Sequence, residues 1–247
     1  MEAVEAAVEA VMLAAQTILE SSGETYRAEE TAQRMGESFG FVKTEILAFP
    51  TGFTIAFHLP DGSVQGRVLR IRERAMRLND INEVNTISRK AAAKELGPLQ
   101  ALERLHDLRR APRMHPALLV LVFGLSAGFF CVMLGGGGKD FLLALTTGCF
   151  VQALMPLYQR MRAPAPLKSL FSGAVAAAVS LLLIGFFGGN QQAVISGALM
   201  PLLPGLAMTN ALRDTIHGDL ISGMARGADA LLSALLLAGG VAFVLGL

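Results

Sequence analysis

The pattern of apolar and polar positions divides the chain into two parts of different character. In residues 1–115, apolar positions recur with helical or strand periodicity, and charged residues lie between them. Residues 116–247 instead contain long apolar runs without charged side chains. The first part holds 15 of the 21 Lys and Arg residues and 16 of the 20 Asp and Glu residues. The pattern predicts a domain of soluble character over residues 1–113 and a transmembrane domain over residues 114–247.

The first domain is predicted to have an α+β fold. Apolar residues recur at helical spacing from Val4 to Leu19, and Ser21, Ser22 and Gly23 end this helix and offer caps for the next one. Segments rich in β-branched and aromatic residues follow, with an Asp-Gly pair as a hairpin signal. The predicted helices cover residues 2–19, 24–38, 78–96 and 99–108, and the predicted strands cover residues 42–49, 51–59 and 61–71.

The second part contains five apolar runs, each about long enough to cross ~30 Å of hydrocarbon as a helix. The fold class predicted is therefore an α-helical membrane protein with about five transmembrane helices and an N-terminal cytoplasmic α+β domain. The predicted spans lie near residues 116–134, 141–158, 169–187, 192–212 and 230–247.

The distribution of basic residues predicts the orientation of these spans. Positive charges cluster before the first span, between the second and third, and between the fourth and fifth, whereas the opposite loops hold only Lys139. The positive-inside rule then places the N-terminus in the cytoplasm and the C-terminus outside. The acidic residues near Met1 are unlike a signal peptide. The orienting residues are Arg109, Arg110, Arg113, Arg160, Arg162, Lys168, Arg213 and Arg226.

Charge and cysteine content exclude several classes of function. Positive and negative charges nearly balance, which gives no electrostatic basis for binding nucleic acid. Cys131 and Cys149 lie in apolar runs without metal-ligand spacing, so we interpret them as small buried side chains and expect no metal and no cofactor. The chain has no nucleotide-binding loop, since the sequence GGGGKD joins two predicted spans.

The fourth predicted span is interrupted by Pro201, Pro204 and Gly205. A proline in a helix removes one donor and frees a carbonyl group, which is costly in hydrocarbon unless protein, water or a ligand satisfies it. Such a break creates a half-helix N-terminus, whose free N–H groups favour an anion such as a carboxylate. The break therefore predicts a site for a small polar solute, with a kinked packing helix as the alternative interpretation.

Polar residues follow the break at helical spacing. Thr209 and Arg213 share one face of the expected helix, and Asn210 and Asp214 share another. An ion pair between Arg213 and Asp214, or ordinary charges at a helix end, are alternatives to substrate contact. The predicted substrate-binding residues are Pro201, Pro204, Gly205, Thr209, Asn210, Arg213 and Asp214. Candidates for proton coupling are Asp214, His217 and Asp219, and Thr146, Thr147 and Gln152 are second-rank polar candidates within the spans.

Two sequence blocks resemble the threonine/serine exporter family. PLLPGLAMTNALRDTIHGDLISG is similar to that family's signature, and SSGETYRAEETAQRMGESFGF with FPTGFTIAF is similar to its cytoplasmic domain. The resemblance implies a secondary exporter in the bacterial inner membrane, not an enzyme. Since single-chain members carry about ten spans, five spans resemble the long subunit of the split form associated with succinate export.

This resemblance also implies partners. They are the lipid bilayer, a small carboxylate or amino-acid substrate, and a short membrane subunit, with self-association as the alternative. Whether the substrate is a dicarboxylate or threonine/serine stays open. The rival hypothesis is a membrane-anchored enzyme or sensor, for which only His58, Asp61 and Glu30 suggest acid–base chemistry in the first domain.

Overall fold

The computed structural model describes residues 2–112, 114–161 and 164–246 and divides them into two compact units. The first unit combines the chain up to Pro112 with Leu206–Gly227. The second unit combines residues 114–205 with the chain from Ala228 onward. Two of the predicted orienting residues, Arg113 and Arg162, lie outside the described residues.

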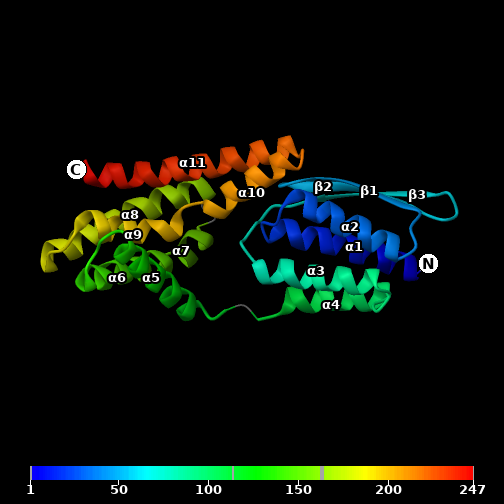
Figure 1. The fold of residues 1–247 in the computed structure, drawn as a ribbon, viewed down its shortest axis with the longest axis horizontal. Helices are drawn as coiled ribbons and strands as arrows, with labels where there is room; N and C mark the ends of the chain where they lie inside the picture. The colour runs from blue at the N-terminus through cyan, green and yellow to red at the C-terminus, as the bar shows by residue number, and fades with distance from the viewer. Residues whose placement is uncertain (1, 113, 162–163, 247) are drawn as a thin grey trace. The chain divides into compact units, whose positions relative to one another are not determined.

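The first unit is a three-layer arrangement built on a small antiparallel sheet. In Figure 1 the sheet lies over α1 and α2, and α3 and α4 pack on the other side of these two helices. The strands follow the order β1-β2-β3, and the predicted α+β character is confirmed for this part of the chain. The elements are α1 (Glu2–Glu20), α2 (Thr25–Ser38), β1 (Lys43–Phe49), β2 (Gly52–His58), β3 (Val64–Arg70), α3 (Leu78–Ala92) and α4 (Pro98–Arg110).

The core of this unit follows from the periodicities in the sequence. Val8, Val11 and Ile18 form the buried stripe of α1, and Phe57 reaches them from β2 because alternate residues of a strand share a face. At the predicted hairpin, the Asp61 carboxylate accepts hydrogen bonds from the Ser63 amide at 2.9 Å and the Ser63 hydroxyl at 2.6 Å. The Asp-Gly signal therefore located the turn between β2 and β3.

The first unit also contains a late segment of the chain. α10 (Gly205–Ile216) and the beginning of α11 (Leu220–Leu245) pack with the N-terminal helices through residues 206–227. The sequence predicted these residues as part of the transmembrane domain, because residues 206–212 continue the fourth apolar run and residues 213–227 connect it to the fifth. Hydrogen bonds across almost 200 residues of sequence separation hold them to the loop before α2.

The second unit is helical and apolar. By length and composition, four helices of the described chain are candidate membrane spans: Pro116–Met133, Gly138–Arg160, Pro166–Phe187 and Leu220–Leu245. A fifth arises if Gln191–Leu202 and Gly205–Ile216, which are bent by 49°, form one broken span. The elements of this unit are α5 (Pro116–Met133), α6 (Gly138–Ala153), α7 (Met155–Arg160), α8 (Ala165–Phe187), α9 (Gln191–Leu199), the 3-10 helix η1 (Met200–Leu202) and the remainder of α11.

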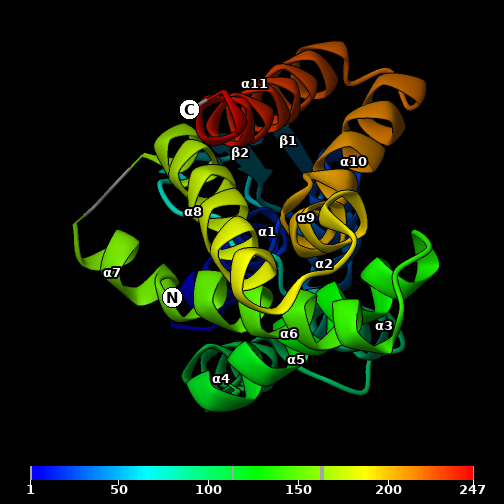
Figure 2. The same ribbon diagram turned by 90° about the vertical axis from the view of Figure 1, so that its left-hand side faces the viewer.

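Small residues allow the helices of this unit to approach closely. A Cβ atom added to Gly173 on α8 would collide with the Leu237 carbonyl group on α11, and one added to Gly240 would collide with the Leu170 carbonyl group. Figure 2 shows α8 beside α11 and α5 beside α6. Small residues at helix contacts are the usual way to gain van der Waals packing in lipid.

Candidate functional site

The predicted break in the fourth apolar segment is present in the structure. α9 ends at Leu199, Pro201 lies in η1, and α10 begins at Gly205 directly after Pro204. The Gly205 amide donates to the Leu203 carbonyl oxygen at 2.8 Å instead of continuing the α-helical ladder. Because proline has no amide hydrogen, the regular bonding pattern cannot pass through this segment. The 49° bend is the result.

The polar residues that follow the break contact the loop between α1 and α2. The Asn210 side-chain amide donates to the Ser22 carbonyl oxygen at 2.8 Å, and Asn210 is buried. Arg213 Nη1 lies 2.7 Å from Glu24 Oε1. The two sequence blocks that carry the family resemblance are thus in direct contact within the first unit.

Asp214 forms the buried centre of this contact. Its Oδ1 accepts from the Thr25 amide at 3.0 Å, its Oδ2 accepts from the Thr25 hydroxyl at 3.2 Å, and its side chain is fully buried. Arg226, which is 4% exposed, lies with Nε 2.8 Å from Asp214 Oδ2 and donates from Nη2 to the Gly23 carbonyl oxygen at 2.6 Å. Asp214 therefore holds α10, α11 and the start of α2 together.

This arrangement changes two expectations from the sequence. The alternative of an Arg213–Asp214 ion pair is wrong, because Arg213 pairs with Glu24 and Asp214 pairs with Arg226. The first turn of α2 receives its carboxylate from Asp214, far along the chain, where the sequence suggested local serine caps. A carboxylate at a helix N-terminus is stabilised by the free amides and the positive end of the helix dipole.

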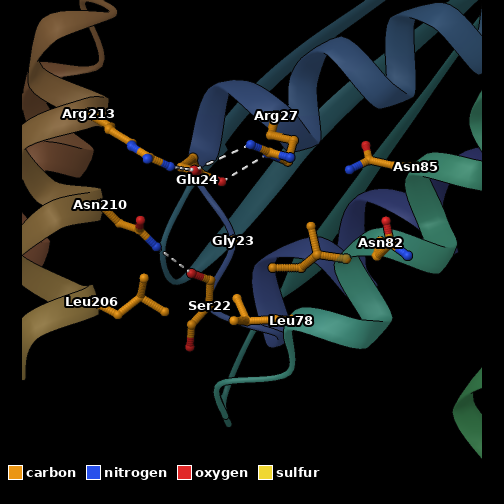
Figure 3. Close-up of a pocket in the computed structure, with 11 residues that line it drawn as sticks. Ser22, Gly23, Glu24, Arg27, Leu78, Asn82, Asn85, Leu206, Asn210 and Arg213 are labelled. Carbon is orange, nitrogen blue, oxygen red and sulfur yellow. Dashed lines mark hydrogen bonds and ion pairs between the residues drawn. The ribbon is translucent and has the colours of Figure 1, made fainter.

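A pocket of about 230 Å³ lies beside this contact, within the first unit. Figure 3 shows Asn210 and Arg213 on α10 at one side of the Ser22–Glu24 loop, and Asn82 and Asn85 on α3 at the other. The polar side chains that line it include Glu24, Arg27, Asn82, Asn85, Asn210 and Arg213, and the apolar ones are Leu78, Ile81 and Leu206.

The pocket carries a net positive charge. Glu24 lies between two guanidinium groups, with Arg27 Nε at 2.9 Å and Arg213 Nη1 at 2.7 Å from its carboxylate oxygens. Burial alone raises the pKa of Glu24, but its backbone and Arg213 hydrogen bonds and the charges of Arg27 and Arg213 together hold that pKa below its ordinary value. Glu24 is consequently ionised at neutral pH, and two positive charges face one negative charge.

Only part of the predicted residue set lines the pocket. Asn210 and Arg213 do so, whereas Asp214 is fully buried in its ion pair. Thr209 lies exposed on α10, and the exposed His217 stacks on Tyr26 with ring centroids 4.1 Å apart. The sequence patterns did not point to Arg27, Asn82 or Asn85 as site residues, although Arg27 lies in the block SSGETYRAEE that carries the family resemblance.

The second-rank residues belong to α6 in the other unit. The Thr146 hydroxyl donates to the Leu142 carbonyl oxygen at 3.0 Å within its own helix. Thr147 is fully buried and accepts from the Ser180 hydroxyl of α8 at 3.3 Å. Gln152 is half-buried on the same helix. The Thr147 contact joins α6 to α8, whereas the Thr146 contact lies within α6 on an exposed residue.

The acid–base residues of the enzyme hypothesis have other partners on the sheet. His58 Nε2 lies 3.0 Å from Glu45 Oε2 across the β1-β2 pair, and Asp61 fixes the hairpin turn through Ser63. Glu30 is exposed on α2. The geometry of these bonds explains local stability of the sheet and gives no support to a catalytic site.

Two carboxyl groups near the Asp214–Arg226 pair have raised pKa values. Burial first, and then the negative charge of Asp214, raise the pKa of Asp219. Burial likewise raises the pKa of Glu29, against a hydrogen bond from the Ala48 amide, and the charges of Asp219 and Asp214 raise it further. Within the described residues, Asp219 Oδ2 is buried without a hydrogen-bond partner. Asp219 therefore combines a raised pKa with an unpartnered carboxylate oxygen in the described part of the chain.

We expect Asp219→Asn to stabilise the protein at neutral pH. A carboxyl group whose pKa is raised on folding destabilises the folded state once it ionises, so stability falls as the pH rises from the ordinary value of 3.8 through the folded pKa. Asparagine removes the charge and keeps the capping capacity at the start of α11. The unfolding temperature should be higher than that of the unchanged protein at pH 7, and the difference should vanish below pH 3.8. Glu83→Gln, an exposed change on α3, is the control.

Comparison with known proteins gives one family and several relatives. Residues 9–247 match the family described as "Putative threonine/serine exporter". The chain is 24% identical to the "Probable succinate transporter subunit YjjP" of Klebsiella aerogenes, over 86% of this chain and 83% of that protein. It is 25% identical to the protein of the same description in Escherichia coli, over 92% and 89%. No solved structure matches the chain.

A third relative is longer than this chain. The "Probable threonine/serine exporter" of Mycobacterium tuberculosis is 22% identical over 88% of this chain, which covers 41% of that protein. The apolar helices define the class of the molecule as a multi-pass membrane protein. Since the family match extends over nearly its whole length, the chain belongs to the threonine/serine exporter family. This confirms the resemblance carried by the two sequence blocks.

Proposed function

We propose that this chain is a subunit of a secondary exporter that moves small carboxylate-bearing metabolites out of the cytoplasm. Membership of an exporter family is the observation that carries the proposal. The solute is a dicarboxylate such as succinate or a hydroxy amino acid such as threonine or serine. These two classes share a carboxylate group and a second polar group on a short carbon chain.

The bent segment supports a solute site near residues 201–214. Pro201, Pro204 and Gly205 interrupt the helix, and α10 begins there with its polar residues facing the N-terminal helices. Asn210 and Arg213 are the residues that we assign to solute contact. Asp214 we assign to holding α10 in place, because it is fully buried and paired with Arg226. Broken helices that present polar groups at a solute site are a recurring device in transporters.

The proposed location is the bacterial inner membrane, with the N-terminus in the cytoplasm and the C-terminus outside. The basic residues Arg109, Arg110 and Lys168 support this orientation through the positive-inside rule. Asp219 and Glu29, whose pKa values are raised, make proton exchange the proposed coupling.

We further propose that export requires a second, shorter membrane subunit. Two relatives carry the word subunit in their descriptions, and this chain spans 41% of the mycobacterial exporter. The additional length of that relative is consistent with a second group of spans joined in one chain. Self-association of this chain is the alternative assembly.

The test is solute flux in reconstituted vesicles. We expect no efflux of labelled succinate, threonine or serine from vesicles that contain the purified chain alone. Efflux should appear when the chain is reconstituted with the membrane protein that co-purifies with it in mild detergent. Mass determination of the co-purified assembly distinguishes a second subunit from a homo-oligomer. Full activity of the monomeric chain by itself would contradict the need for a partner, and no flux of any carboxylate in the complete assembly would contradict the exporter.

A further inference from the structure

We infer that the pocket of the first unit is a recognition site for a small carboxylate, which the guanidinium groups of Arg27 and Arg213 bind. The inference deepens the proposed function and rests on it in one respect, that the ligand is the exported solute. The chemistry of the ligand follows from the pocket itself. Arg27, Asn82 and Asn85 thereby acquire a role that the sequence did not suggest.

The guanidinium groups supply the carboxylate-binding end. Each carries five N–H donors in a fixed fork that matches carboxylate geometry. Glu24 engages Arg27 through Nε at 2.9 Å and Nη2 at 3.5 Å, and Arg213 through Nη1 at 2.7 Å. Among the contacts of the described residues, both side chains therefore retain donors for a ligand. Glu24 also fixes both guanidinium groups, so that little side-chain freedom is lost when an anion binds.

The amide side chains of α3 supply the second polar end. Asn82 and Asn85 are three residues apart, and hence lie one above the other on the same face of the helix. An amide both donates and accepts hydrogen bonds. It therefore suits a second carboxylate as well as an ammonium or hydroxyl group. The shared chemistry is a carboxylate with one further polar group, which covers both classes of solute proposed above.

Size and lining restrict the ligand to a short molecule. The pocket volume of about 230 Å³ lies below the ~300–1,000 Å³ of sites for drug-sized ligands. Leu78, Ile81 and Leu206 contribute apolar surface between the two polar ends, which suits a chain of a few carbon atoms.

The ligand links α10 to the rest of the first unit. Arg213 is carried by α10 and Arg27 by α2, so a carboxylate bound by both strengthens the contact already made by Asn210 and Asp214. A ligand stabilises the arrangement that binds it. α10, which carries Arg213, begins at Gly205 directly after Pro204.

The experiment is a calorimetric titration of the purified full chain in mild detergent. The probes are succinate and threonine, and the neutral diamide of succinate is the ligand control. We expect one of the two carboxylates to bind and the diamide not to bind. The variants Arg27→Gln and Arg213→Gln should each weaken binding roughly tenfold or more, because each removes a charged hydrogen-bond donor. Arg34→Gln removes an exposed charge from the same helix as Arg27 and is the matched control.

A second pair of variants keeps the Glu24 ion pairs intact. Asn82→Leu and Asn85→Leu place apolar bulk at the second polar end, and should weaken binding while thermal unfolding of the protein stays unchanged. Binding that is equal in all variants, or binding of the diamide as tight as that of succinate, overturns the inference.

Flux measurements separate this inference from the proposed function. Carboxylate binding that depends on Arg27 and Arg213, without any flux in the complete assembly, supports the site and contradicts the exporter. Flux with an unchanged KM in Arg27→Gln and Asn85→Leu overturns the site and leaves the exporter standing. Binding of threonine alone or succinate alone identifies which solute class the pocket accepts.

Discussion

Replacing Arg226 with methionine should lower the stability of the first unit by about 3–5 kcal/mol, because it leaves the Asp214 carboxylate buried without its cation. The same change removes the donor to the Gly23 carbonyl group. The unfolding temperature of the purified protein, measured by circular dichroism, should fall by roughly 6–20 °C for a chain of this length. The control is Arg72→Met, an exposed change in the segment after β3, which should leave the unfolding temperature unchanged.

The double variant Asp214→Asn with Arg226→Met tests the cause of this loss. Asparagine can still accept from the Thr25 amide through Oδ1, and its Nδ2 can donate to the Thr25 hydroxyl. It carries no charge, so no unpaired ion remains in the interior. We expect the double variant to be more stable than Arg226→Met alone, with a clearly non-additive double-mutant cycle. Additive losses would show that the two residues act through separate contacts.

The pair of changes Pro204→Ala and Gly205→Leu should abolish export while the protein is still inserted. Both replacements favour an uninterrupted helix, and the regained backbone hydrogen bonds stabilise it by on the order of 1–3 kcal/mol. A straight segment cannot keep the 49° bend that allows α10 to start a separate helix at Gly205. Vesicle flux and membrane abundance are measured in parallel. Normal flux in this variant would mean that the break is only a packing kink.

A control variant and a variant of a proposed solute-binding residue accompany that measurement. Leu212→Ala changes an exposed position on α10 that does not line the pocket, and should leave flux near normal. Asn210→Ala removes the donor to the Ser22 carbonyl group, and should reduce flux together with the stability of the first unit. If only abundance falls in Asn210→Ala, this residue serves helix attachment alone.

Elements with strong periodicity or clear turn signals were predictable from the sequence. The α1 stripe, the three strands and the Asp61-Gly62 hairpin depend on residues that are neighbours in the chain. The apolar runs likewise predict helices because their length is set by the bilayer. Helix ends were less well predicted. α11 begins at Leu220, ten residues before its predicted span, because a charged residue such as Arg226 ends an apolar run but does not end a helix.

The candidate site was only half predictable, for a physical reason. Proline, glycine and helical spacing identify the break and the polar face of α10, because these are local effects. The partners of that face are set by tertiary contacts: Thr25 and Asp214 are 189 residues apart in the sequence, and Gly23 and Arg226 are 203 apart. No periodicity relates such positions. The pocket residues Asn82 and Asn85 resemble any exposed helix face until α10 is placed beside them.

The discontinuous first unit has a consequence for biosynthesis. Its sheet and first four helices leave the ribosome early, but the carboxylate for the first turn of α2 and the guanidinium for the Gly23 carbonyl group arrive with Asp214 and Arg226, after the second unit's first helices. Translation of the ~100 residues between Pro112 and Asp214 takes roughly 5–20 s at ~5–20 residues per second. Throughout that delay the loop from Ser22 to Thr25 is without its final partners, so the first unit is completed only after residues 114–205 have been translated.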